Sequence, residues 1–295
     1  MSRFMPTDPV QLSLAVFEVT LLFAGTGLTL WLFTQARQRQ RWLQTAAMAY
    51  WAVNLPEFLL AAAIVMLCGL AGQTAVHTML GTFIANSPDK GGLEVFAYGI
   101  GLHGGILLGC LLIGPVRRMF YSNYGTEPTP SPRPLAPQSW STTLRHGCGT
   151  LLVALPIVTV ISLGWTALLR AGGLPDEPQD LVTRFAESKC WLVIAGMLFV
   201  ACVLAPLSEE LVFRAGLYRF VRQKLGRTPA LLVSSVCFGA LHANWAGSLP
   251  LAVLGMLLAL VYEATGSLRV VVLAHGLFNL NTILIVLSGL SDSAS

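Results

Sequence analysis

Charged residues are scarce in this chain of 295 residues. They make up 11% of the sequence, whereas hydrophobic residues make up 55%. Soluble globular domains carry about 25% charged residues, so the composition excludes an ordinary soluble domain. The charges fall in short clusters between long apolar runs, which is typical of a membrane protein. The net charge of +4 comes from these clusters and not from a basic stripe with interleaved aromatic residues, so we expect no nucleic-acid partner.

Two other patterns are missing. The six cysteines include no CxxC pair, and each lies in or beside an apolar run, which predicts buried thiols and not a disulfide framework or a zinc knuckle. The sequence also shows no internal repeat, and so it lacks the inverted symmetry of many secondary transporters.

Long apolar runs dominate what is present. Since about 20 apolar residues cross a bilayer, the sequence predicts an all-α polytopic membrane protein of about eight transmembrane helices. The first run is longer than the core of a signal peptide, so we expect a retained span. Pro56 and Pro206 lie inside predicted spans and can kink them if neighbouring groups satisfy the freed carbonyls. The run that contains Pro206 is too long for one untilted crossing, so it is either a long tilted helix or a helix broken near Pro206. The eight predicted spans are residues 12–34, 48–70, 93–114, 149–169, 190–220, 229–246, 249–265 and 269–288.

The loops between these runs predict the organisation and the orientation. Residues 1–120 form an N-terminal three-span region of unknown role, residues 121–147 a Pro-rich cytoplasmic linker, and residues 148–295 a five-span core. Twelve basic residues fall in loops on one side of the membrane and five on the other. By the positive-inside rule we expect both termini on the non-cytoplasmic side, in a multi-pass protein of the plasma (inner) membrane.

Ionisable side chains inside membrane spans are costly and point to function. Glu210 and Arg214 are four residues apart on one helix face, so they can form an ion pair. Glu209 points about 100° away and does not share this partner within its helix. A buried carboxylate of that kind is suited to exchanging protons. We therefore expect Glu209 to act as a base and Glu210–Arg214 to have a structural role.

Two further polar motifs follow in the late spans. The first is Phe238-Gly-Ala-Leu-His242, and the second is His275-Gly-Leu-Phe-Asn279. His275 and Asn279 share a helix face, and both can donate hydrogen bonds to an oxyanion. Taken alone, however, His242 and the His275–Asn279 pair read more simply as residues that pack helices together. The nearest basic residues mark the edge of the membrane, and each helical residue adds about 1.5 Å of depth. On this count Glu209, His242, His275 and Asn279 lie about 9–22 Å below one membrane face, so they can meet there.

In this order and apolar context, the three motifs EExxxR, FxxxH and HxxxN resemble the CPBP family, which includes the type II CAAX prenyl endopeptidases and bacterial immunity-associated relatives. The resemblance covers roughly residues 190–287. It implies an intramembrane glutamic endopeptidase without a cofactor or metal, in which Glu209 and His242 activate water and His275 and Asn279 stabilise the oxyanion. Glu210, Arg214 and Phe238 would support the site. The implied substrate is a membrane-associated protein or peptide, and the family name alone suggests that it is prenylated.

Several alternatives remain at this point. The sequence has no HExxH, no GxSG and no aspartate pair within the spans, which disfavours the other classes of intramembrane protease. Glu209 with the two histidines could instead bind zinc. A non-catalytic immunity or scaffold protein that keeps the fold, and a transporter with a buried Glu/His relay, are the functional alternatives.

Overall fold

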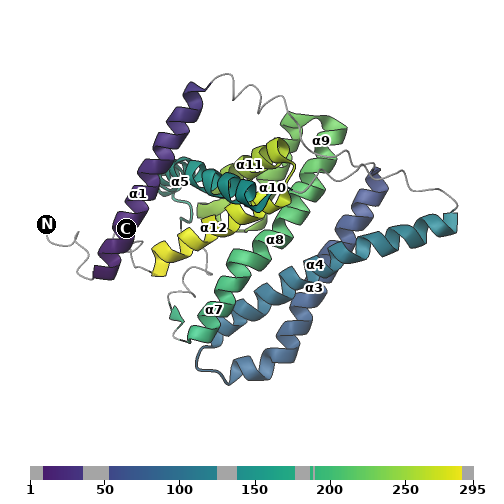
Figure 1. The fold of residues 1–295 in the computed structure, drawn as a ribbon. Coiled ribbons are helices and arrows are strands. Elements are labelled where there is room, and N and C mark those ends of the chain that lie inside the picture. Colours follow the sequence, from purple (N-terminus) through teal and green to yellow (C-terminus); the bar gives the residue numbers. More distant parts are fainter. Residues whose placement is uncertain (1–8, 36–52, 125–137, 177–186, 189, 288–295) are drawn as a thin grey trace. The chain divides into compact units, whose positions relative to one another are not determined.

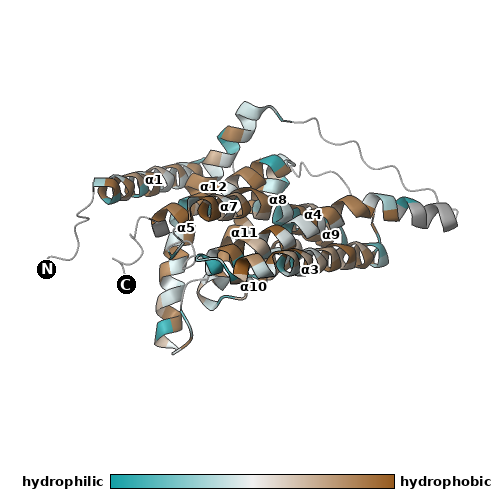
Figure 2. Ribbon diagram, turned by 90° about the horizontal axis from the view of Figure 1, so that it is seen from below, coloured by the Kyte–Doolittle hydropathy of each residue, from teal (hydrophilic) through white to brown (hydrophobic). Residues whose placement is uncertain are grey.

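The chain is an all-α, multi-pass membrane protein. The structure, a computed structural model, describes residues 9–35, 53–124, 138–176, 187–188 and 190–287. Within these ranges seven helices are long and apolar enough to cross a membrane, and hydrophobic residues predominate along them (Figure 2). Large apolar side chains point outward, as Phe23, Met79 and Leu111 do with 75%, 82% and 74% of their surface exposed. Lipid tails solvate such side chains, so the predicted fold class is confirmed.

The helices group into two compact units that interleave along the sequence. Unit 1 comprises residues 1–47, 138–187 and 231–295, and unit 2 comprises residues 48–137 and 188–230. These units differ from the three consecutive regions predicted from the sequence, which are residues 1–120, 121–147 and 148–295. The roles assigned to those three regions stay a prediction.

Unit 2 contains the helices α3 and α4 and one long, segmented helix. α3 (Leu55–Ala85) and α4 (Lys90–Tyr124) pack along each other (Figure 1). The long helix runs over 35 residues from Trp191 to Leu225, about 52 Å. It consists of α7 (Trp191–Phe199), η1 (Val200–Leu204), α8 (Ala205–Glu210), η2 (Leu211–Tyr218) and α9 (Arg219–Leu225), where η marks π-helix.

Unit 1 contains α1 (Pro9–Thr34), α5 (Trp140–Ala171), α11 (Trp245–Thr265) and α12 (Leu268–Leu287). α10 (Arg227–Leu241) starts at the end of unit 2 and continues into unit 1. α5 contacts α1, α11 and α12. Small residues allow close approach here, since a Cβ atom at Gly147 of α5 would lie 2.7 Å from the Leu273 side chain of α12.

The long segmented helix is continuous through Pro206, so of the two alternatives for this run the unbroken helix is the one observed. A proline ring clashes with the carbonyl four residues back and provides no N–H group. Before Pro206 the helix widens instead, and the Ala205 N–H donates to the carbonyl of Val200, five residues back. Pro206 then falls in the first turn of α8, where a missing N–H costs little. The π segment thus lets the helix pass the proline.

Several predicted boundaries differ from the structure. Pro56 does not kink a span but starts α3, where Asn54 and Glu57 form a reciprocal capping box. Both ends of the predicted linker are helical, in α4 to Tyr124 and in α5 from Trp140, while residues 125–137 lie outside the described residues. The predicted sixth span is a helix of only 15 residues, because α10 ends at Leu241.

Glycines hold α3 and α4 together, as the Gly-rich sequence of α4 suggests. A Cβ atom at Gly105 would overlap the carbonyl oxygen of Cys68, and one at Gly109 would lie 2.7 Å from the Cα of Val65. Between lipid-exposed helices, where the hydrophobic effect gives no driving force, such close backbone packing stabilises association. Gly104, next to Gly105, has nothing within 4 Å of its Cβ position.

Because Gly105 is closely packed and Gly104 is not, the same substitution by alanine should affect stability differently at the two positions. We expect Gly105→Ala to destabilise the folded protein by about 1–3 kcal/mol through overpacking. Gly104→Ala gains helix propensity, and it should leave stability unchanged or raise it by up to about 1 kcal/mol. Thermal unfolding of both variants in the same detergent measures the difference. Equal midpoints would contradict the packing of α4 on α3.

Candidate functional site

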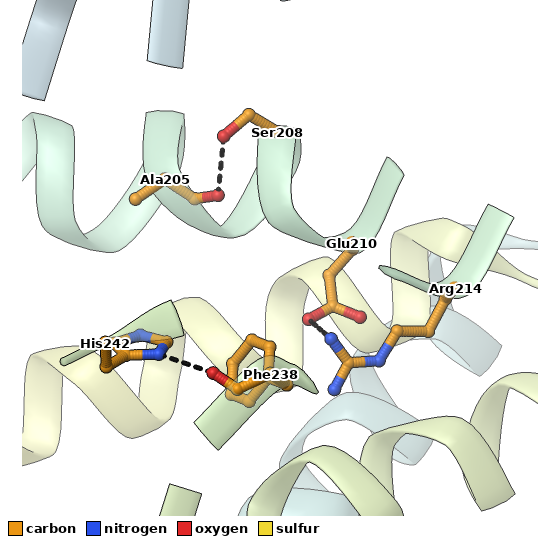
Figure 3. Close-up of polar contacts among 6 residues, drawn as sticks. All are labelled: Ala205, Ser208, Glu210, Arg214, Phe238 and His242. Carbon is orange, nitrogen blue, oxygen red and sulfur yellow. Dashed lines mark hydrogen bonds and ion pairs between the residues drawn. The ribbon is translucent and has the colours of Figure 1, made fainter. Parts of the chain in front are cut away.

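A buried ion pair joins α8 to η2. The Glu210 carboxylate lies 2.9 Å from the Arg214 guanidinium, and both side chains are fully buried (Figure 3). Arginine keeps its charge in proteins, so its burial within a membrane span requires a nearby anion. The spacing of four residues expected from the sequence is what brings the two groups together.

Ser208 and Glu209 precede this pair in the same short helix. The hydroxyl of Ser208 is fully buried and donates to the Ala205 carbonyl at 3.0 Å (Figure 3). It also lies 2.7 Å from Nδ1 of His103 on α4. Glu209 is half-buried, and in helical geometry it points about 100° from Glu210. The contact between Ser208 and His103 could not be predicted from the sequence, because the two residues are 105 positions apart.

The hydrogen bond of His242 fixes its protonation pattern. Its Nδ1 lies 2.7 Å from the Phe238 carbonyl (Figure 3). A carbonyl only accepts, so Nδ1 carries a proton, and in the neutral imidazole the lone pair is on Nε2. His242 lies just beyond α10, in a turn where Ala243 adopts the left-handed φ of 49°. Strain of this kind is common at functional sites. The sequence places His242 inside the span 229–246, whereas in the structure it lies one residue beyond the end of α10.

Phe238 links the two motifs of unit 1. Its ring contacts the imidazole of His242 edge-on at a centroid distance of 5.0 Å, and that of His275 at 5.6 Å. The Phe238 ring has no exposed surface, and Gly255 of α11 makes room for it, since a Cβ there would lie 3.2 Å from the ring. The aromatic ring thus sets the spacing between the two histidines.

α12 carries the last motif. His275 is 2% exposed and Asn279 is half-buried. α12 is α-helical from Leu268 to Leu287, so residues four apart share a face. Both side chains can donate hydrogen bonds in the same direction, and in a site with little water such donors stabilise an anion strongly.

The predicted site residues thus divide between the two units. Unit 1 brings together Phe238, His242 and His275, with Asn279 one turn further along α12. Unit 2 brings together Glu210 and Arg214, with Glu209 in the same turn. The expected meeting of Glu209 with the histidines concerns the relation between the units, and it stays a prediction.

Neither unit groups enough ligand side chains for a zinc ion among its described residues. Within the described residues of each unit, no three His, Cys, Asp or Glu side chains are grouped as ligands of one ion. Zinc needs at least three protein ligands, so neither unit provides a complete zinc site from its described residues. A site formed by Glu209 with both histidines would draw on both units, and it remains the alternative stated above.

Residues 191–281 match the Rce1-like family of type II CAAX prenyl endopeptidases. The matched segment starts at the first residue of α7 and ends within α12. It contains all seven residues expected at the site, and it covers less than a third of the chain. The resemblance inferred from the three motifs is therefore confirmed for this segment.

A curated relative agrees with this match. Over 83 residues the chain is 31% identical to a Bacillus subtilis (strain 168) protein named "Putative membrane peptidase YdiL". The aligned part is 28% of this chain and 34% of the relative, so the chain matches only about a third of that protein's length. No solved structure matches the chain significantly. At the family level, the segment is similar to membrane peptidases of the CAAX-protease type.

The buried ion pair predicts a characteristic pattern of stability. Arg214→Met or Glu210→Met alone leaves one charge buried without its main partner, and each should cost about 3–5 kcal/mol. The double variant Glu210→Met/Arg214→Met removes both charges, and it should recover part of that loss. Denaturant unfolding in detergent measures the three values.

Glu94 provides the control, because it pairs with Lys90 at 3.9 Å and both side chains are partly exposed. Glu94→Met should change stability little, because exposed ion pairs contribute little. Additive losses in the double variant would show that the two buried groups do not act as a pair.

Proposed function

We propose that the chain is an intramembrane endopeptidase that hydrolyses a peptide bond of a membrane-associated protein or peptide. The main support is the family match at residues 191–281, which includes the complete set of EExxxR, FxxxH and HxxxN motifs. Two structural features agree with it. His242 keeps the lone pair of its neutral ring on Nε2, and the buried His275 shares a helix face with Asn279.

In the proposed reaction, Glu209 and His242 bind a water molecule and Glu209 takes one of its protons. The water oxygen attacks the carbonyl carbon of the scissile peptide, and negative charge develops on the carbonyl oxygen. His275 and Asn279 donate hydrogen bonds to this oxyanion. The proton held by Glu209 then passes to the leaving amine as the carbon–nitrogen bond breaks. Glu210 and Arg214 hold the helix turn that carries Glu209.

The proposed substrate lies at the membrane, because the residues assigned to the chemistry lie in or beside helices of the membrane region. The family description includes prenyl endopeptidases, so a prenylated C-terminal segment is one substrate class to test. The proposed location is the plasma (inner) membrane, with both termini on the non-cytoplasmic side.

The proposal predicts that Glu209→Gln lowers the rate of peptide cleavage by about 100- to 10,000-fold, the usual contribution of a general base. The assay uses the purified full chain in liposomes, with membrane-anchored peptides in matched prenylated and unprenylated forms. His242→Gln should cause a similar loss. The double variant should be no slower than the worse single variant, because residues that act as a unit are not additive.

Two controls sharpen the result. Glu94→Gln makes the same chemical change at a partly exposed carboxylate, and it should leave the rate unchanged. A chelator should also leave it unchanged; loss that zinc restores would instead make Glu209 and the histidines metal ligands. Cleavage that continues at full rate in Glu209→Gln would refute the proposed mechanism.

A further inference from the structure

One face of α4 packs along the segmented helix within unit 2. Gly92, Phe96, Gly99 and His103 follow one another at intervals of four, three and four residues, so they share this face. A Cβ atom at Gly92 would lie 2.8 Å from the side chain of Val193, and one at Gly99 would lie 2.6 Å from that of Val200. Between them, the Phe96 ring occupies the space beside Gly196, whose Cβ would lie 2.9 Å from it.

His103 is the next residue on this face, and its contact is polar. Its Nδ1 lies 2.7 Å from the Ser208 hydroxyl oxygen. When the single hydroxyl proton of Ser208 is donated to the Ala205 carbonyl at 3.0 Å, the hydroxyl oxygen accepts from the Nδ1–H group of His103. The two contacts form a chain that joins the imidazole on α4, through the hydroxyl, to a backbone carbonyl of α8.

We propose that His103 is a positioning residue that orients the Glu209 carboxyl group through Ser208. Its effect on catalysis rests on the function proposed above, while its effect on the orientation of Glu209 does not. The N-terminal part of the chain, outside the residues that match the family, thereby gains a defined role at the proposed site.

Only a short stretch of the long helix around Glu209 is regular α-helix. α8 has only six residues, and π-helical segments precede and follow it. In a π turn the hydrogen bonds join residues five apart, and such turns are rare and short. The hydrogen bond between Ser208 and His103 of α4 is a tertiary contact that can fix the rotation of α8. The chain of contacts from His103 through Ser208 ends at the Ala205 carbonyl. Ala205 is four residues before Glu209, so its carbonyl is the position of the α-helical acceptor for the Glu209 N–H group.

The first test follows the Glu209 carboxyl group by infrared spectroscopy of the full chain in liposomes. Its band is identified by its loss in Glu209→Gln. His103→Leu and Ser208→Ala should each shift this band, and the double variant should shift it no further than either single one. His103→Asn, which keeps a nitrogen donor near the position of Nδ1, should restore most of the wild-type band.

A matched control is His77→Leu, because His77 also belongs to unit 2 and stacks on Tyr98 at 4.7 Å. It should leave the Glu209 band unchanged. A band that is unchanged in His103→Leu, or shifts that add in the double variant, would overturn the proposal.

The second test is kinetic and separates positioning from folding. His103→Leu should lower kcat for peptide cleavage by about 10- to 100-fold with little change in KM, and it should unfold at the same temperature as His77→Leu. His103→Asn should recover most of the activity. An activity loss that only follows a lower unfolding temperature would overturn the positioning role. If the wild-type chain cleaves no peptide and Glu209→Gln changes nothing, the proposed function fails, and the infrared band still decides the role of His103.

Discussion

A guanidinium group buried in a membrane protein needs an anion beside it, and this requirement organises the turn that carries both glutamates. Arg214 is fully buried and its Nη1 lies 2.9 Å from Glu210. Because arginine keeps its charge, the chain cannot avoid the cost of burial by releasing a proton. Glu210 is thereby committed to the pair. The adjacent Glu209 points about 100° away along the helix, so two neighbouring carboxyl groups meet different surroundings and can serve different purposes.

The backbone around this pair is adapted in the same way. Pro206 lies four residues before Glu210, and the π turn of η1 allows the helix to continue through it. A second π segment, η2, contains Arg214. Each π turn adds a residue relative to the α-helical repeat, so it changes which later side chains share a face. Such segments often occur at functional sites, and here they set apart the six residues that include Ser208, Glu209 and Glu210.

Much of the fold could be predicted from the sequence, because apolar runs of membrane length are unambiguous. The ion pair and the shared face of His275 and Asn279 were also predictable, since both depend on a spacing of four residues along one helix. The early end of α10 was not, because it depends on the bond of His242 to the Phe238 carbonyl and on the left-handed Ala243. The start of α3 was readable in principle from Asn54-x-x-Glu57, a recognised capping pattern. The contact of His103 with Ser208 was not readable, because no local rule joins residues 105 positions apart.

The histidines of unit 1 show how local packing can prepare a group for chemistry. The Phe238 backbone carbonyl accepts from Nδ1 of His242, and the Phe238 ring contacts both His242 and His275. One residue therefore sets the protonation pattern of the first imidazole and its distance from the second. If a carboxylate and a water molecule meet that lone pair, the ring is already oriented to share the proton, and no reorganisation is needed when the reaction begins.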